Sequence, residues 1–323
     1  MPDNVLYFPY IRVPNSVWFT RILLYWDKVG TLVPFEFIAS PERLGEHTRS
    51  LIERNLVGQI IPGMHVGRIP RFRAAFIDRL DTLGAAMDQR RQSFENAKIF
   101  TIYSEKMFGI GETLMSLKLA RRSPTHGDLF EVEEQTGFEF MTYLAIALSK
   151  LEDLQFIPVT DESFVLERLA PTGSGSLEEV DRFRLQVLEE VLPAPSQPLL
   201  ASDILEFKLD HGKQLGRFRR HIEMELTVIA GFQDEELRKR RLELFKEQLK
   251  AEVEDIRSKM QARGWLRVAV EKLSVLLAPI PWLKPVPSIV KAVLDAFGGE
   301  KPNMESPLAY AAFAQQKLLS KDR

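Results

Sequence analysis

The C-terminal half of the chain changes abruptly from a densely charged stretch to an apolar one. Residues 233–263 read QDEELRKRRLELFKEQLKAEVEDIRSKMQAR, and residues 264–299 read GWLRVAVEKLSVLLAPIPWLKPVPSIVKAVLDAFGG. The first stretch is typical of a long helix with one buried stripe. In the second stretch prolines interrupt the apolar runs, which predicts a helical hairpin over residues 265–298.

Six apolar residues of the charged stretch recur with a mean spacing of about 3.6 residues, the period of a straight helix and not that of a coiled coil. They are Leu242, Phe245, Leu249, Val253, Ile256 and Met260. Opposite charges four residues apart, such as Asp234 and Arg238, stabilise an exposed helical face. We therefore expect one helix whose apolar stripe is buried within its own domain.

The predicted hairpin carries more apolar surface than a short pair of helices normally exposes to water. Its candidate partner-binding residues are Trp265, Leu276, Trp282 and Val290. We expect the hairpin to fold back at Gly264 and to cover the stripe of the charged helix. Two alternatives stay open: the hairpin forms a surface for a protein partner, or it contacts a membrane.

The first 160 residues alternate short β-rich runs with amphipathic helical stretches. Strand candidates are residues 5–8, 29–33, 57–61, 99–103 and 156–159, and helices are expected to begin near Asn15, Pro41, Pro70 and Gly137. The dense apolar positions of residues 17–26 are typical of a helix that covers a parallel sheet. Pro158 predicts that its strand lies at a sheet edge or ends early.

A stretch of linker composition, residues 171–176, marks a domain boundary. No convincing strand follows Ser176. The sequence therefore predicts an α/β domain over residues 1–170, with a mostly parallel sheet and covering helices. An all-helical domain is expected over residues 177–323, with the charged helix 233–263 and the hairpin 265–298.

Composition limits the functional classes. The chain has 323 residues, a net charge of -2 and no cysteine, so it lacks a general attraction to nucleic acid and cannot form disulfides or thiolate metal sites. The basic residues Lys213, Arg217 and Arg220 are bracketed by acidic ones, so we expect a solvated face there and no nucleic-acid binding. The N-terminus does not resemble a signal peptide, and the uncharged run 273–283 is too short for a transmembrane helix. We expect a cytoplasmic protein.

Several short motifs resemble an uncharacterised bacterial protein family. The residues that carry this resemblance are 7–11 (YFPYI) and 23–30 (LLYWDKVG), with similar elements at 134–137, 160–161 and 306–310. The resemblance covers most of the chain and implies a bacterial, cytosolic protein encoded near mobile or antiviral defence genes. It implies no activity and no catalytic residue.

The known phosphate-binding and nucleophile motifs are incomplete in this sequence. Residues 108–114 lack the third glycine of a dinucleotide fingerprint, and residues 58–64 lack the lysine of a P-loop. Residues 173–176 (GSGS) have linker composition and form no hydrolase elbow. The five histidines form no pair with metal-ligand spacing. We therefore expect neither a cofactor nor a metal site.

Carboxylates are the better candidates for catalysis. In a parallel sheet, Thr160 and Asp161 would follow the carboxyl end of a strand, where open α/β sheets bind their ligands. Asp161 is then a candidate general base, with Glu131 or Glu134 as a second carboxylate. The alternative is that Asp161 caps a helix that begins near Phe164.

These observations favour an interaction or regulatory protein that binds a protein partner, and the resemblance implies an association with defence. Two alternatives are kept: an enzyme with a pocket at the strand ends near Asp161, and a membrane-contacting effector acting through the hairpin 265–298. A deep pocket with converging carboxylates or arginines would favour the enzyme. A shallow, exposed apolar patch would favour the interaction protein.

Overall fold

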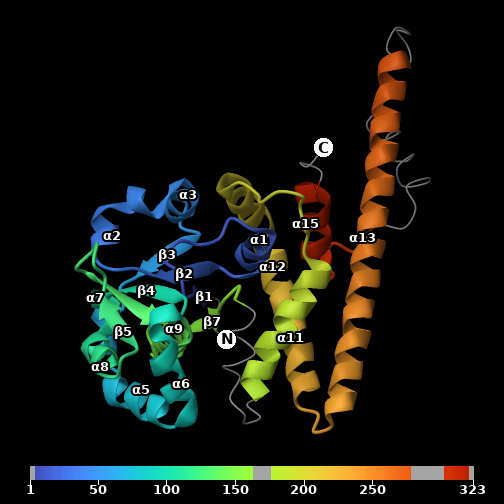
Figure 1. The fold of residues 1–323 in the computed structure, drawn as a ribbon. Coiled ribbons are helices and arrows are strands. Elements are labelled where there is room, and N and C mark those ends of the chain that lie inside the picture. Colours follow the sequence, from blue (N-terminus) through green and yellow to red (C-terminus); the bar gives the residue numbers. More distant parts are fainter. Residues whose placement is uncertain (1–3, 163–175, 278–301, 320–323) are drawn as a thin grey trace. The chain divides into compact units, whose positions relative to one another are not determined.

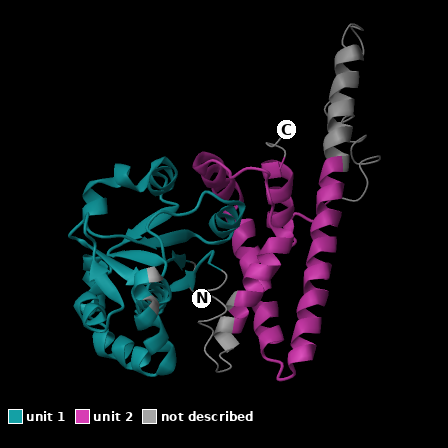
Figure 2. Cartoon of the chain, in the orientation of Figure 1, with its two compact units in different colours: residues 1–173 teal, residues 174–323 magenta. Residues whose placement is uncertain are grey.

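The computed structural model describes residues 4–162, 176–277 and 302–319 (Figure 1). The chain divides into two compact units, residues 1–173 and 174–323, which we call the α/β unit and the helical unit (Figure 2). All the strands lie in the α/β unit, and every regular element described in the helical unit is a helix. The predicted fold class, an α/β region followed by a helical one, is confirmed.

A four-stranded parallel sheet forms the first layer of the α/β unit. Its strands are β1 (Asn4–Tyr7), β2 (Lys28–Leu32), β3 (Val57–Ile60) and β7 (Phe156–Val159), in the order β3-β2-β1-β7. All three pairings are parallel, and Tyr7 lies opposite Thr31 on one side and Val159 on the other. The edge position of β7 agrees with the prediction from Pro158.

The connections around β2 follow the sequence pattern only in part. Helix α1 (Val17–Tyr25) joins β1 to β2, and Ser16 caps it by accepting a hydrogen bond from the Phe19 N–H at 3.2 Å, so the cap lies one residue after Asn15. The single helix expected from Pro41 is split at Gly45, whose φ of 80° cannot continue a helix. This connection contains α2 (Glu36–Ala39), η1 (Pro41–Leu44) and α3 (Glu46–Glu53).

A second, antiparallel sheet in the α/β unit was not anticipated. It contains β4 (Ile99–Tyr103), β5 (Ala120–Arg122) and β6 (Leu129–Glu133), in the order β4-β6-β5. The candidate strand 99–103 therefore does not extend the parallel sheet, because it pairs antiparallel with β6. The remaining helices of the unit are α4 (Gly63–Val66), α5 (Phe72–Asp81), α6 (Ala85–Ser93), η2 (Phe94–Asn96), α7 (Ser104–Met107), α8 (Ile110–Ser116) and α9 (Glu134–Ser149).

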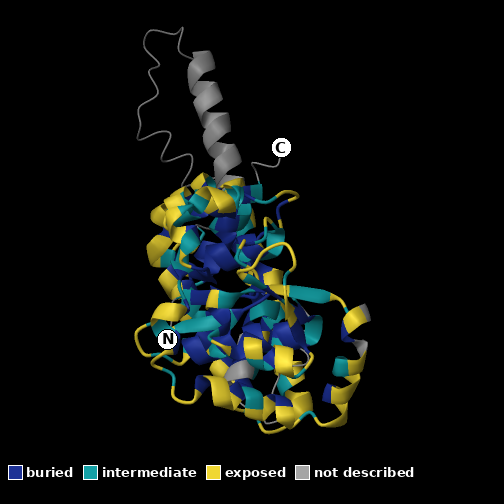
Figure 3. Ribbon diagram, turned by 60° about the vertical axis from the view of Figure 1, so that its left-hand side comes forward, coloured by how far each residue is buried: buried dark blue, intermediate teal, exposed yellow. Residues whose placement is uncertain are grey.

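The two sheets share one hydrophobic core. This core joins Leu6 of β1 and Leu32 of β2 to Phe130 of β6 and to the apolar faces of α5, α8 and α9. Within it, the rings of Phe76 and Phe140 pack edge to face with their centroids 5.3 Å apart. Buried residues run through the interior beneath an exposed outer layer (Figure 3). The shared core fixes the second sheet against the first, which matters for the pocket described below.

The helical unit contains α11 (Ser176–Val191), α12 (Ala201–Ala230), α13 (Glu235–Leu277) and α15 (Ala309–Leu319). Helix α13 packs against the other three. The stripe residues Leu242, Phe245, Leu249, Val253 and Ile256 are buried, which confirms that the charged helix hides its apolar face within its own unit. Between α11 and α12, the buried guanidinium of Arg184 donates to the carboxylate of Glu223.

The structure differs from the predicted fold-back at Gly264, because α13 continues through this glycine to Leu277. A glycine costs only about 1 kcal/mol inside a helix, and no proline occurs between Gly264 and Pro279. Residues 265–277 therefore extend the same helix and cannot pack back onto its own stripe, against which α11, α12 and α15 lie instead. The turn and second arm of the predicted hairpin lie outside the described residues.

Candidate functional site

The carboxyl ends of β1 and β7 lie side by side at one edge of the parallel sheet, since Tyr7 is paired with Val159. The chain places β2 on one side of β1 and β7 on the other. The strand order thus reverses at β1, and open α/β sheets bind ligands at such a switch point, outside the carboxyl ends of the strands. Residues 9–12 and 160–162 follow these two ends.

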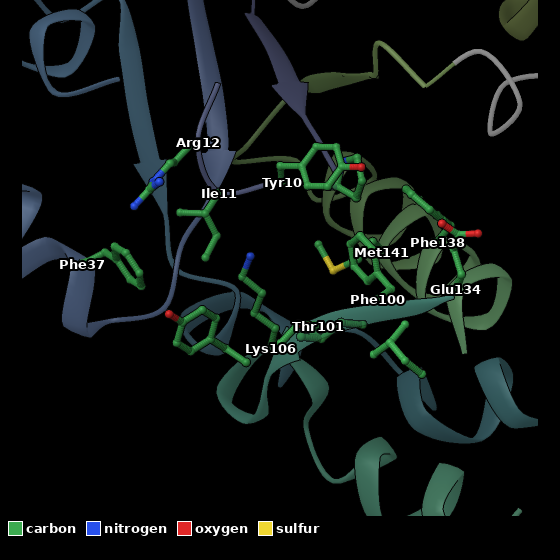
Figure 4. A pocket seen from close by; sticks show the side chains of 14 residues that line it. Tyr10, Ile11, Arg12, Phe37, Phe100, Thr101, Lys106, Glu134, Phe138 and Met141 are labelled. Atoms are coloured by element: carbon green, nitrogen blue, oxygen red, sulfur yellow. The ribbon is translucent and has the colours of Figure 1, made fainter. Parts of the chain in front are cut away.

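A pocket of about 620 Å³ lies beside residues 9–12 (Figure 4). Its other walls come from β4, from Lys106 of α7, from the first half of α9 and from Phe37. Sites for small organic molecules commonly enclose roughly 300–1,000 Å³. The pocket therefore has both the position and the size of a ligand site.

Hydrogen bonds to β2 and α3 hold the backbone around residues 9–12. The buried Thr31 hydroxyl on β2 donates to the Ile11 carbonyl at 2.9 Å and lies 3.3 Å from the Tyr10 carbonyl. Just beyond, the Val13 N–H donates to the Thr48 hydroxyl at 3.3 Å. Consecutive side chains from Tyr10 to Arg12 are therefore carried on a backbone held by β2 and α3.

Aromatic rings form much of the pocket wall. The ring centroids of Phe100 and Phe138 lie 4.7 Å apart, and that of Tyr10 lies 6.0 Å from Phe100 and 6.4 Å from Phe138. Gly137 allows this packing, because a Cβ atom at its position would come within 2.8 Å of Phe100. Such walls suit a flat, largely apolar molecule.

Lys106 supplies the most unusual polar group of the pocket. Its side chain is only 3% exposed and points into the pocket (Figure 4). Within the described residues no carboxylate forms an ion pair with its amine. The neighbouring carboxylate of Glu105 instead accepts hydrogen bonds from the Phe35 N–H at 2.9 and 3.1 Å. Burial lowers the pKa of Lys106 to about 7, so much of the amine is uncharged at neutral pH.

Two other charged residues line the pocket. The Arg12 guanidinium is exposed and donates to the Arg43 carbonyl at 2.8 Å. Glu134 lies in the first turn of α9, where the preceding Glu133 is the N-cap and accepts from the Thr136 N–H at 2.8 Å. The Glu133 carboxylate therefore holds the start of its own helix, whereas Glu134 and Arg12 line the pocket.

Asp161 lies at the predicted strand end, but its carboxylate is hydrogen bonded to Tyr7 and does not line the pocket. Its Oδ1 accepts from the Tyr7 hydroxyl at 2.9 Å, and Glu162 Oε1 accepts from the Tyr10 hydroxyl at 2.7 Å. Burial, together with these carboxylates, raises the pKa of both tyrosines far above the usual value, so both keep their protons. The helix that Asp161 was alternatively expected to cap would occupy residues outside the described ranges.

The other two carboxylate candidates separate in the structure. Glu131 lies inside β6, where its carboxylate accepts from the Arg121 Nε at 2.8 Å, and it is not part of the pocket wall. Glu134 is the one carboxylate of the three that lines the pocket. Lys106 was missed, although it follows the strand candidate 99–103 by only three residues, at a place where α/β proteins often carry functional side chains.

Only two of the four candidate partner-binding residues belong to an element that the structure describes. Trp265 and Leu276 belong to α13, whereas Trp282 and Val290 lie outside the described residues. In the described ranges, no group of three His, Asp or Glu residues is arranged to hold a metal ion. No described helix is sufficiently long and apolar to span a membrane.

Comparisons with protein-family models, curated proteins and solved structures find no match for this chain. The resemblance to a bacterial family therefore rests on the quoted motifs alone.

Proposed function

We propose that the α/β unit binds a small organic molecule with a flat, largely apolar body, and that Lys106 engages a polar oxygen-bearing group of this molecule. One observation carries the proposal: an amine that forms no ion pair among the described residues is buried and points into an aromatic pocket at the switch point of a parallel sheet. Burying a lysine amine is costly, and an apolar side chain would fill the same space without that cost.

The charged residues of the pocket narrow the ligand class. Arg12 and the protonated fraction of Lys106 provide positive charge, against the single carboxylate of Glu134. A ligand that carries a carboxylate or sulfonate beside an aromatic ring would match both the walls and the charge. Like the enzyme alternative derived from the sequence, this proposal places a ligand near the strand ends of the parallel sheet. It differs in that Lys106, and not Asp161, is the residue that engages the ligand.

The interaction function expected from the sequence is proposed for the helical unit. Three large apolar side chains of α12 are exposed, namely Leu209 (76%), Met224 (64%) and Val228 (56%). Exposed apolar residues on one helix support a contact with a protein partner. A regulatory protein that binds a ligand in one unit and a partner through the other would combine both proposals.

The pocket can be tested with the fluorescent dye 8-anilino-1-naphthalenesulfonate, a flat aromatic anion. We expect saturable binding of one dye per chain, weakened at least about tenfold by Lys106→Met and by Tyr10→Ala, which corresponds to about 1.4 kcal/mol each. The matched controls are Lys28→Met and Phe35→Ala, which remove an exposed lysine and an exposed aromatic ring outside the pocket lining. Dye binding that is absent, or that neither pocket variant weakens, would refute the proposal.

A further inference from the structure

The amine of Lys106 lacks the ion pair that normally accompanies a buried lysine with a structural role; among the described residues no carboxylate forms one. A structural buried lysine normally forms an ion pair with a carboxylate. Here the carboxylate of Glu105 is hydrogen bonded to the Phe35 N–H. The titratable and charged residues that face the pocket are Tyr10 and Arg12 after β1, Tyr103 on β4 and Glu134 on α9.

Burial favours an uncharged amine, because desolvation lowers the pKa of Lys106. The neighbouring carboxylate of Glu105 acts in the opposite direction but is outweighed by burial. The pKa values of Tyr10 and Tyr103 are raised, so both rings stay neutral and add no negative charge beside the amine. A lysine in such a setting is a nucleophile at neutral pH, whereas exposed lysines are almost fully protonated.

We propose that Lys106 condenses with the aldehyde or ketone carbonyl of the bound ligand to form an imine. This inference rests on the proposed function and names the ligand class for the same pocket: a flat aromatic carbonyl compound, with an anionic substituent that Arg12 can meet.

The condensation needs no further reactant. The lone pair of the Lys106 Nζ attacks the carbonyl carbon, and the π electrons move to the oxygen, which takes up a proton as the nitrogen loses one. The resulting carbinolamine then loses its hydroxyl group with the second proton of the nitrogen as water, and a carbon–nitrogen double bond forms. Addition of water reverses both steps, so the adduct is reversible until it is reduced.

The test uses the full chain with 4-formylbenzoate and sodium cyanoborohydride, followed by intact mass measurement and peptide mapping. Cyanoborohydride delivers hydride to the imine carbon and fixes the adduct as a secondary amine. We expect one adduct per chain, on Lys106, formed at neutral pH at least about tenfold faster than on the exposed Lys28 and Lys118. Labelling of Lys106 should rise with a midpoint near pH 7.

Two variants make the outcome decisive. Lys106→Met should lose the rapid adduct while retaining the wild-type circular dichroism, and Lys28→Met should keep it. Excess anilinonaphthalenesulfonate should slow the labelling of Lys106 by competition. Labelling spread over surface lysines at similar rates would overturn the imine but leave the binding function standing if the dye still binds in the pocket. Loss of both dye binding and Lys106 labelling would overturn both.

Discussion

Replacing Lys106 by methionine is expected to stabilise the α/β unit while removing the amine that points into the pocket. The buried lysine has a pKa of about 7 against 10.5 in the unfolded chain. At roughly 1.4 kcal/mol per pKa unit, this shift makes burial of the titrating amine unfavourable by about 4 kcal/mol at pH 7. Methionine is of similar length and carries no charge. We expect the free energy of unfolding to rise by about 3 kcal/mol, because part of the gain is offset by imperfect packing.

The stabilisation should depend on pH in a defined direction. The folded-state pKa of Lys106 is depressed, so between pH 7 and 10.5 the unfolded state binds more protons than the folded state. The wild type therefore gains stability as pH rises through this window, by up to about 1.4 kcal/mol per pH unit. Lys106→Met lacks this contribution. The difference in stability between the two proteins should shrink steadily from pH 7 to about pH 10.

Scanning calorimetry at a series of pH values measures this difference, and it separates the transitions of the two units if they unfold independently. Lys28→Met is the matched control, since the lysine it removes is exposed at the start of β2. This control should change the free energy of unfolding by less than about 0.5 kcal/mol. A Lys106→Met protein that is less stable than wild type at pH 7, or whose gain does not change with pH, would refute the buried-amine argument.

Four further substitutions test other parts of the fold. Gly137→Ala should destabilise the α/β unit by about 2 kcal/mol in chemical denaturation, because its Cβ would lie 2.8 Å from Phe100; an unchanged or higher stability would show that α9 can move away. Tyr7→Phe should cost about 1 kcal/mol through loss of its hydrogen bond to Asp161, whereas Asp161→Asn keeps an acceptor and should cost less; the reverse order in thermal melts would contradict this assignment. Leu249→Asp should cost several kcal/mol by placing a charge in the helical core, and an intact melting transition would show that the stripe is not buried.

The sequence contained enough information to predict the parallel sheet. Apolar runs such as residues 29–33, separated by helical patterns, are typical of buried parallel strands, and Pro158 marked the edge strand correctly. The second sheet was not predicted as such. Its strand β5 has only three residues, two of them exposed arginines, so it carries no apolar pattern. Its position is determined by pairing with β6, which single-sequence periodicity does not report.

For the candidate site, the expected parallel topology directed attention to the strand ends near Asp161. The structure has a pocket beside residues 9–12, which follow β1, and Asp161 does not line it. The topology could not show that this carboxylate is used to hold Tyr7, because that contact joins residues 154 positions apart in the chain. Lys106 was not predicted for a similar reason. In the sequence it looks like any surface lysine that follows a strand, and only the structure shows the residues that exclude water from it.

Thr31 holds the carbonyls of Tyr10 and Ile11 through one hydroxyl group on a neighbouring strand. The backbone beside the pocket is thus fixed by an atom that belongs to none of the residues facing the ligand. The Thr31 hydroxyl therefore supports this backbone independently of the side chains of Tyr10, Ile11 and Arg12. Libraries randomised at these three positions would show whether the segment can be diversified toward new ligands while the sheet stays intact.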